Sequence, residues 1–507
     1  MQSVKSNIRA NFIGRFWTVA MHFAFVPLYI RFIGIEGYGL IGFFIVLVGV
    51  TGALDLGMSA VLNRELARRM AMGNGHACRD LVRTFEAVYW GAGIAVGSAI
   101  ALLSGPISRT WLQAVSLDAA SVRRAVLLMG LVLAAQLPLI LYQGGLRGLE
   151  RQVSLNVVTV IFVTLRTGGA ALVLWLVAPT VDAFFGWHVG AVALHAIVLG
   201  GLLWHHLPGE GRGRFDSSQF VAVRGFAVDL AAISVLALVF TQLDKVILSR
   251  LVDLDDFGYY SLATVIAGGL AYAVLPTFEA VYPRFSALVA DGKDRGYLVD
   301  LYHRASQLVS VVLLPIAMVV AAFASDVIWV WTGSVDAASN AGPLLTLLVI
   351  GSALNGLVNV PYALMLAHGW TRLPLFLNLG AVVLLLPLLV IVVNRYEAIG
   401  AAAIWTAVNV GYLVVGVTAL HRRHLAGELN RWVFSDVVGP AVAGAVVVLF
   451  ARLASPTLES RLFTGVWLAL TVGASLLAAS LATRMGRQQL RSLAQRRRPA
   501  SFFGSGT

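Results

Sequence analysis

The sequence predicts an all-α integral membrane protein with about fourteen transmembrane helices, and three observations carry that prediction. Of its 507 residues, 59% are hydrophobic and only 12% are charged, whereas soluble globular proteins average about 25% charged residues. Its mean hydropathy is +0.83. Apolar runs recur that are long enough for a helix to cross the hydrocarbon core, which takes about 20 residues. These runs do not alternate as barrel strands do, so helices are the expected spanning form.

The apolar runs follow one another along almost the whole chain. The first begins after basic residues, as a secretory signal does, but it is too long for the apolar core of a signal. It also lacks a small-residue cleavage site, so we expect it to be retained as a span. The expected spans cover residues 11–32, 38–60, 84–104, 123–145, 156–177, 184–206, 226–249, 259–282, 305–323, 342–366, 373–393, 399–420, 436–454 and 462–483.

Lysine and arginine are distributed unevenly between the connectors. If the N-terminus is cytoplasmic, inside segments carry 27 of these residues and outside segments carry 8, with Arg166 and Lys245 lying within spans. The positive-inside rule therefore predicts that both termini are cytoplasmic. The net charge of +12 resides in these connectors and in a basic tail from Arg484 to Arg498. We expect that tail to contact anionic membrane lipids or to enforce topology, and we expect no nucleic-acid partner.

The chain lacks the sequence signatures of catalysis. It contains no GxxxxGK[ST] loop, no HExxH and no GxSxG, and Cys78 is its only cysteine. No connector looks long enough for the folded extracytoplasmic domain that membrane glycosyltransferases and polysaccharide polymerases usually carry. We therefore expect that the protein is not an enzyme and uses no metal or cofactor.

An internal duplication is visible at an offset of 219 residues. Residues 31–39 and 250–258 share the pattern Arg, two apolar residues, Gly or Asp, aliphatic, acidic, any, aromatic, Gly. Each repeat holds six spans, so both halves run the same way through the membrane. This predicts two six-helix lobes related by a pseudo-two-fold axis along the membrane normal, with a cavity between them. The expected lobes are 1–210 and 211–420, and residues 421–507 hold two extra helices and the tail.

Several stretches together resemble one family of transporters. They are Asn11-Phe-Ile-Gly14, Pro27-Leu-Tyr-Ile-Arg-Phe-Ile-Gly34, Glu36-Gly-Tyr-Gly39, Leu54-Asp-Leu-Gly57, Asn63-Arg-Glu-Leu-Ala-Arg68 and Gly144-Gly-Leu-Arg-Gly-Leu-Glu-Arg151. With the span count and the duplication, the chain resembles the polysaccharide-transport branch of the multidrug/oligosaccharidyl-lipid/polysaccharide exporter superfamily. That branch includes the Wzx-type O-antigen flippases.

The resemblance implies an alternating-access flippase in the bacterial inner membrane. Its expected substrate is a polyprenyl-diphosphate-linked oligosaccharide, an O-antigen or exopolysaccharide unit, and the polymerase and glycosyltransferases of the same pathway are candidate partners. Two alternatives within the superfamily stay open: a drug or cation antiporter, which a deep carboxylate in the first lobe would favour, and a lipid II flippase.

A flippase must shelter an anionic head group, so polar and cationic residues inside spans are the candidates for binding it. Asn11, Arg15 and His22 lie on one face of the first span, and Tyr29 extends that face. The alternative for Arg15 is a cytoplasmic anchor. Arg166 lies near the middle of span 156–177, where a lone cation costs about 2.5–3.5 kcal/mol, so we expect it to face the protein interior. There it would bind a head group, act as a gate, or bridge to an acid or a helix end.

Other candidates are distributed over both lobes. Lys245, Gln136, Asn355 and Asn359 are expected to bind substrate, although ordinary interhelical hydrogen bonds would also explain the amides. His22, Asp244, Asp55 and Glu279 are the candidates for ion coupling or gating. We expect the adjacent Asp244 and Lys245 to find different partners, because neighbouring residues do not face each other on a helix. We expect Asp55 and Glu279 to pair with arginines of the connectors or to be solvated.

Overall fold

The computed structural model describes residues 4–73, 75–209, 211, 213–218, 242–292, 294–455, 460–483 and 486–488. The seventh expected span therefore lies outside the described residues except from residue 242 onward. The basic tail also lies outside them apart from the segment that includes Arg487.

The described residues are helical, and the β-pairing among them is a single isolated bridge between Gln113 and Asp253. Eleven of their helices are long and apolar enough to cross a membrane. The predicted all-α membrane fold is thus confirmed.

The first elements are α1 (Val4–Ala53), α2 (Met58–Ala71), α3 (Gly75–Pro106), η1 (Ile107–Trp111), α4 (Ala119–Gly148), α5 (Gln152–Leu176), α6 (Val181–His206) and α8 (Leu254–Gly269). The remaining elements are α9 (Ala271–Asp291), α10 (Arg295–Ala322), α11 (Ala324–Thr332), α12 (Val335–Ala367), α13 (Arg372–Gly411), η2 (Tyr412–Val417), α14 (Thr418–His424), α15 (Leu429–Arg431), η3 (Trp432–Val438), α16 (Gly439–Leu453) and α17 (Arg461–Ala482).

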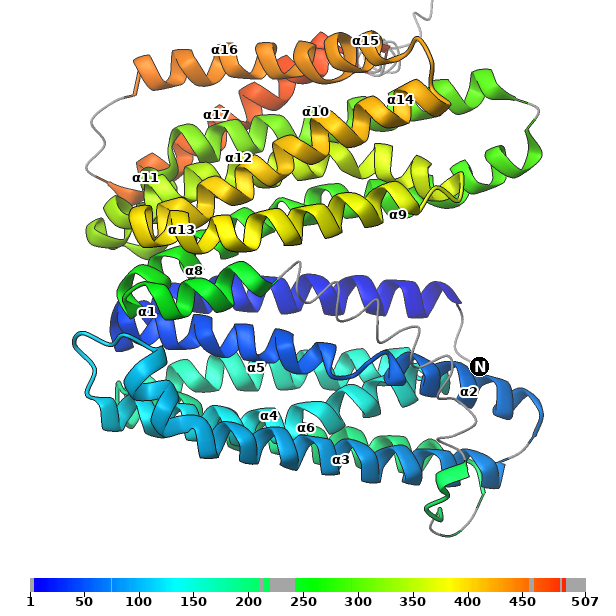
Figure 1. Ribbon diagram of the computed structural model, residues 1–507, viewed down its shortest axis with the longest axis vertical. Coiled ribbons are helices and arrows are strands. Elements are labelled where there is room, and N and C mark those ends of the chain that lie inside the picture. The colour runs from blue at the N-terminus through cyan, green and yellow to red at the C-terminus, as the bar shows by residue number, and fades with distance from the viewer. Residues whose placement is uncertain are drawn as a thin grey trace, which may run out of the picture. The chain divides into compact units, whose positions relative to one another are not determined.

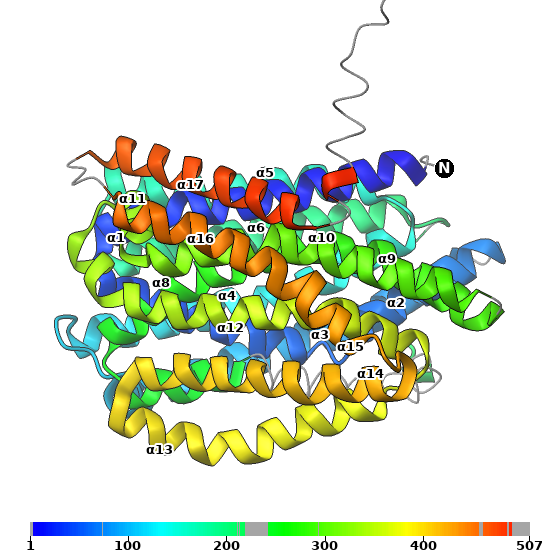
Figure 2. The same cartoon turned by 90° about the horizontal axis from the view of Figure 1, so that it is seen from above.

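Two of these elements each contain two crossings. At 50 residues, α1 would be about 75 Å long if straight, which is far more than a bilayer core. The chain instead reverses at Gly34, whose φ of 72° is in the left-handed region (Figure 1). α13 reverses in the same way at Glu397, with φ 51° (Figure 2). The first and second expected spans, and likewise the eleventh and twelfth, are therefore joined without a loop.

The chain divides into two compact units, Met1–Ser261 and Leu262–Thr507. The boundary lies within α8. The lobe boundaries expected from the duplication stay a prediction, because residues 219–241, which follow the proposed join, lie outside the described residues.

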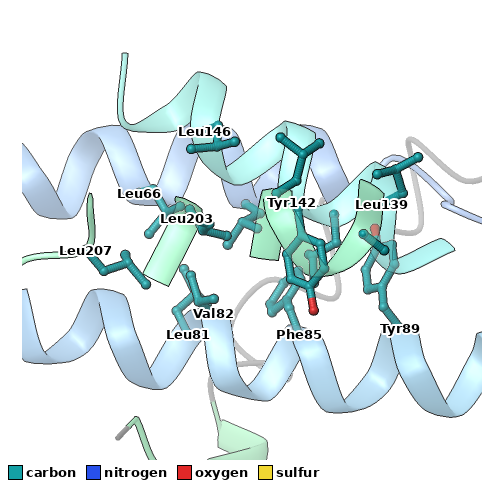
Figure 3. Packing of buried hydrophobic residues seen from close by; sticks show 14 of the residues in the cluster. Leu66, Leu81, Val82, Phe85, Tyr89, Leu139, Tyr142, Leu146, Leu203 and Leu207 are labelled. Carbon is teal, nitrogen blue, oxygen red and sulfur yellow. The ribbon is translucent and has the colours of Figure 1, made fainter. Parts of the chain in front are cut away.

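The core of the first unit lies where α2, α3, α4 and α6 meet at one end of the bundle. Figure 3 shows Leu66, Phe85, Leu146 and Leu203 converging there, and all four are at most 1% exposed. Further along α3, this helix approaches α4 closely, because Gly93 and Gly97 of α3 have no side chain to separate the two backbones.

The duplicated sequence motif makes a reciprocal contact inside the first unit. A Cβ atom added to Gly39 would overlap the carbonyl oxygen of Leu254, and one added to Gly258 would lie 2.5 Å from the carbonyl oxygen of Ile35. Gly258 is the duplicate of Gly39, and Leu254 is the duplicate of Ile35. A two-fold axis requires such an exchange between equivalent residues, so this contact supports the predicted pseudo-symmetry locally.

Alanine at either glycine of this contact should destabilise the protein. Gly39→Ala and Gly258→Ala each force a methyl group against backbone, which costs about 1–3 kcal/mol. We expect the two melting temperatures in detergent to fall by similar amounts, because the contacts are equivalent. Gly52→Ala is the matched control, since a Cβ there meets nothing within 4 Å. Equal stability of all three variants would contradict the contact.

The second unit is organised around α10. This helix packs against α9 and α12 on the side of the duplicated helices and against η3, α16 and α17, which lie outside the duplication. α17 also contacts α11. The two extra C-terminal helices therefore form a hairpin attached to α10.

Candidate functional site

The polar face predicted on the first span lies against α5. The Asn11 amide donates to Gln152 Oε1 at 3.1 Å and accepts from Asn156 Nδ2 at 2.7 Å. The Tyr29 hydroxyl donates to the carbonyl oxygen of Thr167 at 2.8 Å. Part of this face is therefore used to join two helices, which the sequence did not indicate. Another part of this face, around His22, lies close enough to Arg166 to interact with it electrostatically.

Arg166 lies on α5 between these two points of attachment. Its guanidinium interacts electrostatically with His22 and Tyr29 of α1 and with His188 and His195 of α6. No carboxylate in the described part of the chain pairs with it. The expectation that it faces the protein interior fits this position. The alternative of a bridge to an acid finds no support among the described residues.

The neighbours of Arg166 on α6 are two histidines whose rings contact aromatic side chains. The His188 Nδ1 lies 2.9 Å from the carbonyl oxygen of Phe184, and the two rings are 4.2 Å apart. The His195 ring stacks on Phe162 at 4.5 Å. Its Nε2 is buried and has no hydrogen-bond partner within the described residues. The site thus combines a cation with a buried imidazole nitrogen that can donate to an anion in its N–H tautomer.

An apolar cavity of about 930 Å³ adjoins this site between α1, α5 and α6. Leu165 and Gly168 of α5 are part of its wall, so it borders the same turns of helix that carry Arg166. Arg31 is the charged residue among its lining. The aromatic side chains that line it are Phe25, Phe32, Trp175 and Trp187. The cavity can hold hydrocarbon next to the cation.

The remaining first-unit candidates for substrate binding lie in different surroundings. Arg15 is exposed on α1, and its charge repels that of Arg147 at the end of α4. Gln136 is half-buried on α4. Lys245 Nζ lies 3.5 Å from Asp244 Oδ1, so the expectation that these neighbours have only separate partners is wrong. The flexible lysine stem lets its charge curl back along the helix, while Asp244 also accepts from the Tyr260 hydroxyl at 2.9 Å.

The gating candidates differ in burial. Asp55 is 9% exposed and accepts hydrogen bonds from the Ser59 amide at 3.2 Å, from the Ser59 hydroxyl at 2.8 Å and from the Tyr89 hydroxyl. It therefore holds the start of α2 against α3, and pairing with a connector arginine is not what the structure shows. Glu279 is exposed on α9.

The second-unit amides join helices. Asn355 donates to Asn409 Oδ1 at 2.8 Å, which links α12 to α13. Asn359 donates to the carbonyl oxygen of Asn355, one turn earlier in α12, at 3.1 Å. Both contacts match the interhelical and local hydrogen bonding that the sequence left open as the alternative to sugar binding.

Sequence reasoning missed a buried group in the second unit. His303 of α10 contacts two carboxylates, Asp436 and Glu428, on the segment that leads into the extra hairpin. Each of the three residues lies at or beyond the edge of an expected span, where charged residues are ordinary. No local signal in the sequence indicates that they meet.

Comparisons with known proteins identify relatives of the chain. The family model described as "Polysaccharide biosynthesis protein" matches residues 4–289. A curated "Putative O-antigen transporter" of Shigella flexneri is 22% identical over 376 residues, covering 74% of this chain and 88% of that protein.

Solved structures share the fold. The lipid II flippase MurJ in an inward closed conformation matches with a TM-score of 0.68 and 12% identity, covering 97% of this chain and all of MurJ. An inward-facing multidrug resistance MATE family transporter of the MOP superfamily matches with a TM-score of 0.64 and 13% identity, covering 80% of this chain and 96% of that one. At these identities the similarity shows the fold alone.

Proposed function

We propose that this chain, which belongs to the polysaccharide biosynthesis protein family, is a flippase for a polyprenyl-diphosphate-linked oligosaccharide. Its substrate would be an O-antigen or exopolysaccharide unit carried across the bacterial inner membrane by alternating access. Glycosyltransferases that build the unit on the cytoplasmic side and a polymerase that consumes it outside are the expected partners. Both termini are proposed to be cytoplasmic, because the connectors on that side hold most of the Lys and Arg.

The observation that carries the proposal is that Arg166 has no carboxylate partner among the described residues. A guanidinium binds phosphate through two parallel hydrogen bonds, and in a region of low dielectric this attraction is strong. A diphosphate is the part of the substrate that would take this position. The substrate would then supply the negative charge that no described residue offers to Arg166.

The apolar cavity beside Arg166 supports a lipid-linked anion over a soluble one. A wall of aromatic and aliphatic side chains next to a cation matches a molecule with a charged head and a hydrocarbon tail. The prenyl chain would follow the apolar face of α5 while the diphosphate contacts Arg166.

An antiporter for organic cations would need a free carboxylate deep in the first unit. There Asp55 and Glu86 are each held by tyrosine hydroxyls, from Tyr89 and Tyr142 respectively. Asp244 is paired with Lys245. Among the carboxylates that the structure describes in this unit, this arrangement favours an anionic cargo.

Reconstitution into proteoliposomes tests the proposal. We expect the protein to move a polyprenyl-diphosphate oligosaccharide between leaflets, measured by access of an external glycan-modifying enzyme, at a rate well above protein-free vesicles. Lipid II is assayed in parallel, because MurJ shares the fold. Movement of lipid II alone would transfer the assignment to that substrate. Exchange of small cations without lipid movement would favour the antiporter and overturn the proposal.

A further inference from the structure

His303 is enclosed between two acids at the junction of α10 with the extra hairpin. Its Nδ1 lies 2.5 Å from Asp436 Oδ2, and its Nε2 lies 3.0 Å from Glu428 Oε2. The side chains of His303 and Asp436 are 1% and 0% exposed, whereas that of Glu428 is 29% exposed. Gln307 Nε2 donates to the second oxygen of Asp436 at 2.9 Å. Both ring nitrogens therefore face a carboxylate at hydrogen-bond distance.

To satisfy both N···O contacts, the site needs one proton more than a neutral histidine supplies. A neutral imidazole carries one N–H, which can satisfy one of the two N···O contacts, and an ionised carboxylate can only accept. The other contact would then place a lone pair against a carboxylate oxygen. A second proton, on the ring or on one of the acids, removes this repulsion. The geometry is thus that of a loaded proton-binding site.

The two acids differ in what they can do when the proton leaves. Asp436 is fully buried and keeps its bond from Gln307. Glu428 is partly exposed, and Arg431 Nη1 lies 3.5 Å from its Oε2, so a second cation is already beside it. Loss of the proton therefore releases Glu428 from His303 toward Arg431, while Asp436 stays with α10.

The other polar groups facing the site come from α10 and α14. The Tyr302 hydroxyl lies 3.4 Å from His421 Nε2, and the Trp432 ring packs against His421. Arg304 is turned outward in an exposed pair with Asp300. Of these groups, His421 is itself titratable and interacts electrostatically with His303, Glu428 and Asp436. Asp436 itself lies in the π-helical turn η3, a conformation that is frequent at functional sites.

A polar line continues from the site along α10. Gln307 and then Ser310 follow His303 on the same helical face. Ser310 is 0% exposed, and its hydroxyl has no hydrogen-bond partner within the described residues. A buried hydroxyl without a partner is costly, and here it offers a next position for a proton that moves into the span.

We propose that His303, Asp436 and Glu428 form a proton-binding site that couples transport to proton movement. The proposal rests on the flippase function above and adds the coupling ion. Protonation fastens the segment from Glu428 to Asp436 onto α10, and deprotonation frees its Glu428 end. The extra hairpin thereby changes its attachment once in each transport cycle.

Melting temperature as a function of pH tests the site without any transport assay. Wild type should lose stability as the pH rises and the site loses its second proton, because one ring nitrogen then sets a lone pair against a carboxylate oxygen. Glu428→Gln places an amide donor opposite Nε2, so the contact needs no extra proton and the variant should show a flat profile. His303→Gln should also be flat. His205→Gln, which changes an exposed histidine of α6, should keep the wild-type profile.

Coupling is tested in proteoliposomes with and without a pH gradient, acid outside. One proton crossing one pH unit contributes about 1.36 kcal/mol, so the final distribution of the flipped lipid should shift about tenfold in wild type and in His205→Gln. The shift should vanish in Glu428→Gln. A wild type that flips with no response to the gradient, or a Glu428→Gln variant that keeps it, would overturn the proposal. A wild type with the expected pH profile but no flipping would count against the flippase function and leave the proton site standing.

Discussion

Replacing Arg166 with alanine should reduce flipping by about ten- to a hundred-fold while leaving the protein at least as stable as wild type. A hydrogen bond to a charged group contributes about 1.5–3 kcal/mol, and this range of energy corresponds to that loss of rate. The cation itself costs about 2.5–3.5 kcal/mol at the middle of a span, and no described carboxylate offsets that cost. Removal of a purely structural residue would instead lower the melting temperature.

Two further variants separate charge from shape at this position. Arg166→Lys keeps the charge but loses the planar fork, so we expect a rate between those of wild type and alanine. Arg124→Ala removes an exposed arginine that pairs with Asp182 at 2.8 Å and should leave flipping unchanged. Flipping rates and melting temperatures are measured on the same preparations. A less stable Arg166→Ala variant that still flips would assign Arg166 a structural role.

Hydropathy could predict the crossings because the bilayer demands long apolar runs, but the ends of the helices depend on turns. The second crossing was expected to reach residue 60 and ends at Ala53. The chain turns there through left-handed conformations at Leu56 and Gly57. Hydropathy averages over a window of residues and does not detect such a turn.

Arg166 could be found from the sequence because a lone charge in an apolar run stands out. Its surroundings could not, since His22 and His195 come from helices on either side of it in the chain. For the site at His303, neither the charged residues nor their contacts could be found from the sequence. His303 and Asp436 are separated by 133 residues. Each lies at the edge of a span, where charged residues are common and hydropathy does not distinguish a buried one from an exposed one.

Small-residue spacing shows the same limit. The spacing of Gly93 and Gly97 predicts close helix contact, and these residues do approach α4. Gly186 and Gly190 have the same spacing, yet a Cβ on either would meet nothing within 4 Å. A short motif identifies a smooth helix face, but the neighbouring helix decides whether that face is used.

Glu36→Ala should be strongly destabilising, because Glu36 stabilises the fold, whereas Arg166 is proposed to bind substrate. Glu36 is 4% exposed and lies just after the reversal at Gly34. Its carboxylate accepts from the amides of Val115, Ser116 and Leu117 at 2.5, 3.0 and 2.9 Å, and from the Ser116 hydroxyl. Alanine leaves these donors without their acceptor, and each unsatisfied buried group costs about 1–3 kcal/mol.

The expected result for Glu36→Ala is a melting temperature lower by about 10 °C, given a shift of about 2–4 °C per kcal/mol for a unit of this size. Hydrogen exchange of residues 112–118 should speed up, because the amides lose the bonds that protect them. Glu36→Gln is the matched variant: its carbonyl oxygen can still accept, so we expect a smaller loss. The Glu-Gly-Tyr-Gly stretch would then have a physical basis, because one carboxylate ties the reversal of α1 to the segment that leads into α4. Unchanged exchange at residues 112–118 in Glu36→Ala would show that the reversal holds without it.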